Sequence, residues 1–538
     1  MMKRLFLLMI LGVTSVLCLN AQTKSLHQLQ QEFVDLRCGM FIHFNMPTFF
    51  NEDWPDPDAA PELFNPVRMD CKQWAKAAKS ANMTYGCLTT KHHSGFCIWD
   101  TKTTDYSVMS SPFKRDVVKE YADAFRAEGM KVMLYYSILD THARLRPKCI
   151  TPQHIEMIKE QLRELLTNYG EVHEVWFDGA NGEGPNGKKQ EYDWTAILST
   201  IRRLQPRAVT AIMGDDVRWV GNERGLGRET EWSATVLTPG TYARCEEQNK
   251  ALGVKATSKD LGGRDMLVNA KELFWYPSEV DVSIRPGWFY HQQEDNQVKS
   301  LKHLTDIYFK SVGYNSVLLL NIPPDQRGRI SDADVNRLKE FADYRKEIFA
   351  DNRVKGGLKA WTARPGDTRV YQLKPKSEIN VVMLREDISK GQRMEAFTVE
   401  ALTADGWKEI AKGTTVGYKR LIRIPAVEAR QLRVKVDACR LAANISEVAA
   451  YYARPLEESA AKEDWNDLPR TAWKQVTAAP LVIDLGKAVD MTGFVYAPAN
   501  AEAKPTMAFR YKFYISTNGR DWKEAVSYTH LTLPTICS

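Results

Sequence analysis

The chain contains 538 residues, of which 44% are hydrophobic and 26% charged, a composition typical of soluble globular proteins. This length exceeds what a single hydrophobic core supports, so we expect two or three domains. The formal net charge of +6 is small, and basic residues are interspersed with acidic ones without a Lys/Arg block, which argues against a nucleic-acid-binding protein.

The N-terminal segment has the pattern of a secretory signal peptide. Lys3 and Arg4 precede an apolar run over Leu5–Leu17, and Ala21 provides a small residue at a cleavage site. We therefore predict a signal peptide over residues 1–21 and a periplasmic or secreted protein. The apolar run is too short to span a membrane and no later segment is long enough, so we expect no membrane span.

Strand-like and helix-like segments alternate over the next part of the chain. The expected strands are Gly39–Phe44, Tyr85–Thr90, Lys131–Ser137, Glu174–Asp178, Val209–Met213 and Ser316–Asn321. The expected helices are Met69–Ala81, Asp116–Glu128, Pro152–Asn168 and Tyr192–Leu204. This α/β order predicts a parallel sheet closed into a (β/α)8-like TIM barrel over residues 24–350. A doubly wound sheet is the alternative, but no P-loop motif occurs to support it.

After the barrel the helical periodicity gives way to alternating apolar and polar residues. Segments such as Ile379–Leu384, Glu395–Leu402 and Leu421–Pro425 are separated by turns. This pattern predicts an antiparallel β-sandwich over residues 351–455.

The C-terminal part contains a second β region. The turn-plus-tryptophan segment Asn518–Trp522 resembles the start of a discoidin-like carbohydrate-binding module, so we expect a truncated third β module over residues 475–525. The segment Val526–Thr535 resembles the translated end of a sequencing adapter. We therefore expect residues 526–538 to be foreign to the natural protein.

Several expected barrel strands end in polar residues that a core would not select. His43 lies in the first strand motif, His92 and His93 follow the second strand, and Asp178 ends the fourth after Val175–Phe177. The carboxyl ends of barrel strands meet on one face, where the catalytic residues of this fold lie. We therefore expect these side chains to form one site. Asp178 taken alone could equally open a turn or cap a helix.

These residue types are typical of a carbohydrate site. Neutral imidazoles and arginine hydrogen-bond to hydroxyl groups, and tryptophan faces stack on the C–H faces of sugar rings. Cleavage of a glycosidic bond requires two carboxyl groups, which Asp178 and Glu223 could supply. Glu231 and Glu279, in polar loops near aromatic residues, are rival candidates for the acid.

Four motifs together resemble glycoside hydrolase family 29, the retaining exo-α-L-fucosidases, over residues 38 to about 350. They are Gly39–Phe44, Thr90–Phe96, Trp176–Gly179, and Arg218–Trp219 with Gly221–Glu223. Three further segments are similar to the subfamily that acts on α-1,3/1,4-linked fucose in branched glycans. They are Asn222–Gly225, Glu231–Ser233 and Val282–Trp288.

The resemblance implies that Asp178 is the nucleophile and Glu223 the general acid/base of a double displacement. It also implies a set of substrate-binding residues, with Arg218 beside the nucleophile and two tryptophans as pocket walls. This set is His43, His92, His93, Trp54, Trp176, Arg218 and Trp288. Some family members have Glu before the tryptophan matched by Trp54, whereas this chain has Asp53.

The implied substrates are fucosylated oligosaccharides or glycoconjugates, hydrolysed without a cofactor or metal. A metal-dependent barrel hydrolase using His43, His92, His93 and Asp178 is an alternative. Adjacent histidines on a strand, however, point to opposite faces and chelate poorly. A non-catalytic protein that binds fucosylated glycans is the other alternative.

Overall fold

The structure, a computed structural model, divides into two compact units, Met1–Glu458 and Ser459–Ser538. It describes residues 24–50, 52–144, 150–179, 192–239, 243–356, 360–456, 474–478, 481–486 and 511–528. The expected signal peptide over residues 1–21 lies outside these ranges. Within them, no helix has both the length and the apolar character needed to cross a bilayer.

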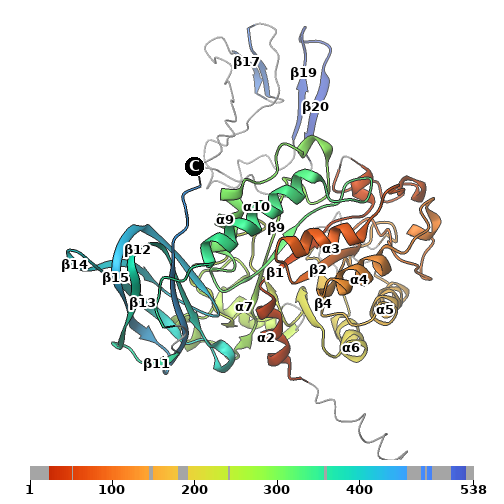
Figure 1. Ribbon diagram of the computed structural model, residues 1–538. Helices are drawn as coiled ribbons and strands as arrows, with labels where there is room; N and C mark the ends of the chain where they lie inside the picture. The colour runs from red at the N-terminus through yellow and green to blue at the C-terminus, as the bar shows by residue number, and fades with distance from the viewer. Residues whose placement is uncertain are drawn as a thin grey trace, which may run out of the picture. The chain divides into compact units, whose positions relative to one another are not determined.

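Eight parallel strands form the barrel of the first unit (Figure 1). Their spatial order is β5-β4-β3-β2-β1-β10-β9-β6. They are β1 (Cys38–Ile42), β2 (Tyr85–Lys91), β3 (Lys131–Tyr136), β4 (Glu174–Phe177), β5 (Val209–Ile212), β6 (Arg218–Trp219), β9 (Ser278–Ser283) and β10 (Val317–Asn321). A parallel bridge between Ala211 and Val217 joins the two ends of this order. The expected (β/α)8-like barrel is therefore confirmed.

Helices connect and surround the strands of the barrel. They are α2 (Leu26–Leu36), α3 (Cys71–Ser80), α4 (Val117–Ala127), α5 (Pro152–Thr167), α6 (Trp194–Leu204), α7 (Ala243–Leu252), α8 (Arg264–Val268), α9 (Leu301–Lys310) and α10 (Asp332–Phe349). Short 3₁₀ turns lie at η1 (Met46–Phe49), η2 (Pro61–Leu63), η3 (Val108–Ser110) and η4 (Gln292–Glu294). The four expected helices correspond to α3–α6. Each begins after an Asp or Thr whose side chain accepts a hydrogen bond from a backbone N–H of the first turn, as helix capping requires.

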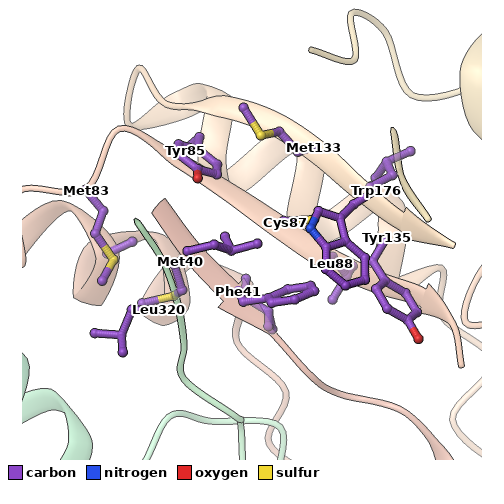
Figure 2. Packing of buried hydrophobic residues seen from close by; sticks show 14 of the residues in the cluster. Met40, Phe41, Met83, Tyr85, Cys87, Leu88, Met133, Tyr135, Trp176 and Leu320 are labelled. Atoms are coloured by element: carbon purple, nitrogen blue, oxygen red, sulfur yellow. The ribbon is translucent and has the colours of Figure 1, made fainter. Parts of the chain in front are cut away.

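Aromatic side chains fill the interior of the barrel. Every residue of β1 and β2 is buried, as expected for parallel strands covered on both faces. Phe41 packs edge-on against Trp176 at 5.0 Å between ring centroids, and Tyr135 stacks on Trp176 at 5.2 Å (Figure 2). These rings form a rigid floor beneath the carboxyl ends of the strands.

Two barrel strands, β6 and β9, lie in segments that the sequence analysis did not expect to be strands. All six residues of β9 are buried, including Glu279 and Asp281. Both carboxyl groups accept hydrogen bonds from interior donors, Glu279 from Tyr85 and Asp281 from Trp219. These donors make the acidic residues compatible with a buried strand.

The second half of the first unit is an antiparallel sheet of six strands in the order β11-β16-β12-β15-β13-β14. They are β11 (Trp361–Ala363), β12 (Thr368–Glu386), β13 (Met394–Thr403), β14 (Gly406–Gly413), β15 (Arg420–Cys439) and β16 (Ala443–Tyr451), with η5 (Ile388–Lys390) between β12 and β13. The long strands β12 and β15 change register at two points, and the sheet encloses its own apolar core. The expected antiparallel domain is therefore confirmed.

Two more short sheets complete the described chain. In the first unit, β7 (Ala234–Thr235) pairs with β8 (Phe274–Trp275). In the second unit, β17 (Lys474–Ala478) pairs with β18 (Leu481–Asp484), and β19 (Tyr511–Ile515) pairs with β20 (Lys523–Tyr528). Residues 487–510 of the expected third module, and residues 529–538 of the expected foreign tail, lie outside the described residues.

Candidate active site

Three imidazoles meet at the carboxyl ends of the first strands. The ring centroids of His43 and His92 are 6.1 Å apart, and those of His92 and His93 are 4.1 Å apart. Tyr135, near the end of β3, stacks on His92 at 6.0 Å. All four side chains are buried. The strand ends therefore bring together the histidines that the sequence analysis selected.

His92 and His93 lie in a turn, because β2 ends at Lys91. Their rings approach each other at an interplanar angle of 40°, so the expectation that they point to opposite faces of a strand is wrong. The described residues nevertheless contain no group of three or more His, Cys, Asp or Glu side chains arranged to hold a metal ion.

The turn that carries these histidines is anchored by the buried ammonium of Lys91. It donates hydrogen bonds of 3.1 Å to Tyr136, Asp140 and Gln161, which use all three of its N–H groups. The carbonyl of His93 also accepts from the backbone N–H of Thr141 at 2.8 Å. A charged group with this full set of partners holds the turn in one position.

Asp178 follows β4 directly and points to the same face. Its Oδ2 accepts a hydrogen bond from the Tyr135 hydroxyl at 3.0 Å, and the Nε2 atom of His93 lies 3.9 Å from this oxygen. The Asp178 side chain is 24% exposed, whereas that of His93 is 6% exposed. The carboxylate is thus held by a specific donor and remains accessible from the solvent side.

Burial keeps the three imidazoles neutral. It lowers the pKa of His43 to about 4, and it also lowers the pKa of His92 and that of His93. The neighbouring imidazoles lower the pKa of His92 further. Neutral imidazole has one donor and one acceptor nitrogen, the combination that hydroxyl groups require.

Two hydrogen bonds indicate which nitrogen of the ring carries the proton. Ser137 donates its hydroxyl to the Leu139 carbonyl, so it accepts from the Nδ1 of His93 at 2.7 Å. Asn321 donates its amide to Ser283, and its carbonyl oxygen accepts from the Nδ1 of His43 at 2.9 Å. In both histidines Nε2 is therefore the acceptor atom.

The three tryptophans of the expected set take different positions around the histidines. Trp54 stacks on His93 at 4.4 Å and is 48% exposed, so it lies at the rim. Trp288 lies 5.0 Å from His43. Trp176 is buried and stacks against Tyr135 (Figure 2). Trp54 and Trp288 are thus arranged as walls, and Trp176 as floor.

Asp53, the residue before Trp54, has a partner from a distant part of the chain. Its Oδ1 lies 3.2 Å from the Nε2 of His291, which follows β9. This contact joins the loops after β1 and β9.

Arg218 contacts a different carboxylate from the one expected. Its buried guanidinium ion-pairs with Glu231, and it donates to the carbonyls of Tyr276 at 2.9 Å and Trp232 at 3.0 Å. The sequence analysis did not anticipate the pair with Glu231, and the position of Arg218 beside Asp178 stays a prediction. A buried guanidinium requires a carboxylate and acceptors, which Glu231 and the two carbonyls supply to its Nε and Nη2 atoms.

The rival acids are both enclosed. Glu231 is paired with Arg218 and Arg228, and its side chain is 1% exposed. Glu279 lies beneath Trp176, whose indole N–H donates to it at 2.9 Å, and burial raises its pKa to about 7. Glu223, in contrast, is exposed on the loop after β6. Of the three, only Glu223 is open to a large leaving group.

Sequence reasoning missed Tyr135, Asn321 and Asp281. Tyr135 and Asn321 lie inside expected strands, where a tyrosine or asparagine is not distinctive. Burial raises the pKa of Asp281 well above its ordinary value, and the negative charge of Glu223 raises it further. In the sequence, Asp281 could have been noticed as a carboxylate that stands between two valines.

Comparison with known proteins gives one consistent result for the barrel. The family model for alpha-L-fucosidases matches residues 50–347, more than half of the chain, and that for F5/8 type C domains matches residues 450–535. The chain is 37% identical to alpha-L-fucosidase 1 of Arabidopsis thaliana over 463 residues, covering 79% of this chain and 87% of that protein.

Solved structures share the fold. A Bacteroides ovatus protein assigned as an alpha-L-fucosidase is 59% identical, with a TM-score of 0.79 over 95% of this chain and 90% of that one. A glycoside hydrolase family 29 fucosidase from Ruminococcus gnavus, solved in complex with fucose, is 26% identical, with a TM-score of 0.68 over 79% of this chain and 94% of that one.

Proposed function

The chain belongs to the alpha-L-fucosidase family of glycoside hydrolases, and on this premise we propose that it releases α-1,3- and α-1,4-linked L-fucose from glycans with retention of configuration. Asp178 is the nucleophile and Glu223 the general acid/base. The observation that carries the proposal is the Asp178 carboxylate, held by Tyr135 next to three neutral imidazoles.

The reaction proceeds in two displacements. An oxygen of Asp178 attacks the anomeric carbon of fucose, and the bond to the leaving oxygen breaks while Glu223 transfers its proton to that oxygen. The product is a fucosyl ester of Asp178. Glu223 then removes a proton from water, which attacks the same carbon and releases Asp178. Two inversions give net retention.

The neutral histidines supply the means of holding fucose. The Nε2 atoms of His43 and His93 can accept hydrogen bonds from sugar hydroxyls without placing a positive charge beside the developing oxocarbenium ion. The exposed face of Trp54 can pack on the apolar face of the sugar. Specificity for α-1,3 and α-1,4 linkages is proposed from the sequence likeness of Asn222–Gly225, Glu231–Ser233 and Val282–Trp288 to the corresponding subfamily.

The linkage and the stereochemistry are tested together. The purified protein is incubated with α-1,2-, α-1,3- and α-1,4-fucosylated oligosaccharides, and the first product is followed by proton NMR. We expect α-L-fucose as the first product, released from the α-1,3- and α-1,4-linked substrates. Initial release of β-L-fucose would contradict the retaining mechanism, and preferential release from α-1,2 linkages would contradict the linkage assignment.

The two carboxyl groups are distinguished by their dependence on the leaving group. Asp178→Ala should lower kcat/KM at least about a thousandfold on every substrate, because no nucleophile remains. Glu223→Ala should lower kcat/KM on oligosaccharides about 10²- to 10⁴-fold, with a much smaller loss on aryl fucosides, whose leaving groups need little protonation. Equal losses on both substrates would assign the acid to another residue.

We also propose export to the periplasm or beyond, on the basis of the signal-peptide pattern in residues 1–21. Sequencing the N-terminus of the protein from its native host should find Gln22 as the first residue. A mature protein that starts at Met1 would contradict this proposal.

A further inference from the structure

The loop that carries Glu223 packs closely on the barrel in its first half. Gly225 adopts a φ of +77°, and a Cβ atom at this position would lie 2.9 Å from Ile307 of α9. The backbone N–H of Gly227 donates to the carbonyl of Lys310, at the end of α9, at 2.7 Å. This half of the loop therefore lies directly against α9, and side chains other than glycine do not fit at Gly225.

The two ends of the loop are drawn together by Arg228. Its Nη2 donates to the Val220 carbonyl at 2.8 Å, and its Nε donates to the Ser258 carbonyl at 2.7 Å. Its remaining nitrogen, Nη1, lies 3.1 Å from Oε2 of Glu231. Glu231 also pairs with Arg218 of β6. These three charged groups therefore form one network that holds the two ends of the loop together, and we call these ends the neck of the loop.

The outer side of this neck is bound by the antiparallel sheet domain. Gln392, which lies just after η5 and is 5% exposed, makes two hydrogen bonds with the backbone of the loop. Its Nε2 donates to the Glu231 carbonyl at 2.7 Å, and its Oε1 accepts from the backbone N–H of Ser233 at 2.8 Å. A single side-chain amide thus pairs with two backbone groups of the loop, in the manner of a neighbouring strand.

Three further hydrogen bonds join the antiparallel sheet domain to the same part of the loop. The hydroxyl of Thr415 accepts from the backbone N–H of Glu231 at 3.0 Å, and Thr414 and Thr230 share a hydrogen bond of 2.8 Å. Arg420, at the start of β15, donates to the carbonyl of Glu229. All of these partners belong to one domain, and all of them reach the segment from Glu229 to Ser233.

We propose that Gln392 and Thr415 are positioning residues of the fucosidase reaction, through which the antiparallel sheet domain holds the loop of Glu223 at the barrel mouth. The inference rests on the assignment of Glu223 as acid/base. The inference gives the antiparallel sheet domain a role in the proton transfer by Glu223.

The physical reason is that Glu223 lies on a loop, whereas Asp178 lies at the end of a strand. A carboxyl group on a loop reaches the leaving oxygen only when the loop is held in place, and a displacement of about 1 Å can cost about a hundredfold in rate. A strand end is fixed by the sheet itself. We call the hydrogen bonds of Gln392 and Thr415 to the loop backbone the clasp. Loosening the clasp should therefore impair protonation of the leaving group and leave the attack by Asp178 largely intact.

The test uses the full-length variants Gln392→Leu and Thr415→Val, each of which removes clasp hydrogen bonds at similar side-chain volume. The control is Arg423→Gln, which removes another ion pair between the two domains, that of Arg423 with Asp306 of α9, without a contact to the loop. For each variant, kcat/KM is measured on an α-1,4-fucosylated oligosaccharide and on 2-chloro-4-nitrophenyl α-L-fucoside. Glu223→Ala is measured in parallel.

We expect Gln392→Leu and Thr415→Val to lose about 10- to 100-fold on the oligosaccharide and less than about threefold on the aryl fucoside. Arg423→Gln should lose less than about twofold on both. If one clasp variant does not fold, the other provides the same comparison. A role in stability alone would lower the melting temperature without changing the ratio between the substrates.

Equal losses on both substrates, or no loss, in the clasp variants would overturn the inference while Glu223→Ala still discriminates between them. If Glu223→Ala itself fails to discriminate, the acid assignment is wrong and the inference falls with it. The two failures are therefore distinguishable.

Discussion

The hydroxyl of Tyr135 is an uncharged donor to the carboxylate of Asp178, at 3.0 Å. Burial raises the pKa of Tyr135 well above its ordinary value, and the charge of Asp178 raises it further, so the hydroxyl keeps its proton. A neutral donor orients a nucleophile without cancelling its charge. In the proposed mechanism, Tyr135 therefore fixes the direction of attack.

Removing this hydroxyl gives a direct prediction. Tyr135→Phe should lower kcat/KM by about 10- to 100-fold on both oligosaccharides and aryl fucosides, since a hydrogen bond to a charged group contributes about 1.5–3 kcal/mol. The phenyl ring still stacks on Trp176, so the melting temperature should change little. Steady-state kinetics checks the first statement and thermal denaturation the second. Activity within twofold of the wild type would contradict this role.

At the residue scale, sequence reasoning succeeded where a strand end determined the position. His43, His92, His93 and Asp178 follow strands, and parallel strands place their carboxyl ends together. Arg218 could not be placed in this way, because sequence gives no indication of which carboxylate a buried guanidinium will meet. Tyr135 went unnoticed because an aromatic residue in a strand is ordinary.

At the scale of elements, β9 carries acidic groups inside the barrel. Glu279 accepts hydrogen bonds from Tyr85 and Trp176, both at 2.9 Å, and is fully buried. Burial raises its pKa from 4.5 to about 7. Glu174 of β4 lies in the same interior, and its pKa is also raised, first by burial and then by the charge of Glu279.

This shift predicts a pH dependence of stability with a definite sign. Between pH 4.5 and about 7 the folded protein holds the Glu279 proton more tightly than the unfolded chain does, so the free energy of unfolding falls as the pH rises through this window. Glu279→Gln removes this contribution. The free energy of unfolding of the variant, relative to that of the wild type, should therefore increase by on the order of 3 kcal/mol between pH 4.5 and about 7.

Urea denaturation of both proteins at a series of pH values measures this difference. A difference in unfolding free energy that stays constant from pH 4.5 to 7 would contradict the raised pKa of Glu279. Comparing the two proteins at each pH cancels the effect of His43, whose lowered pKa destabilises the fold toward acid with the opposite slope.

The two barrel strands that the sequence analysis missed, β6 and β9, lack a recognisable apolar pattern. In β9 the acidic residues Glu279 and Asp281 interrupt the apolar pattern, and β6 has only two residues. Hydropathy patterns recognise strands whose interior is apolar, whereas Glu279 and Asp281 of β9 accept hydrogen bonds from Tyr and Trp donors in the barrel interior. The helices were easier, because their apolar periodicity and capping residues are local signals.

At the scale of the whole molecule, all of the described candidate-site residues belong to the first unit. The chain is held to the sheet domain up to Ala453 by Asn380, which exchanges two hydrogen bonds of 2.7 Å with that residue. Truncation after Glu458 should therefore leave kcat/KM on aryl fucosides within about twofold of the full chain, because no described site residue is lost. Loss of activity in a folded truncation product would contradict this division.

The order of domains could be predicted from sequence because each has its own periodicity. The contact between the barrel and the antiparallel domain could not, since it depends on side chains such as Gln392 and Glu231, which lie far apart in the sequence. Only the folded chain brings them together. For the same reason, the contact between the antiparallel sheet domain and the loop of Glu223 could be found only in the structure.

The central claim is that Asp178 forms a covalent bond to fucose. The most direct measurement is to incubate the protein with 2-deoxy-2-fluoro-L-fucosyl fluoride, digest it and analyse the peptides by mass spectrometry, since the fluorine slows breakdown of a glycosyl-enzyme ester. We predict one added 2-fluorofucosyl group on the peptide that contains Asp178 and none in Asp178→Ala. A stable adduct on another residue, or turnover without any adduct, would contradict the account.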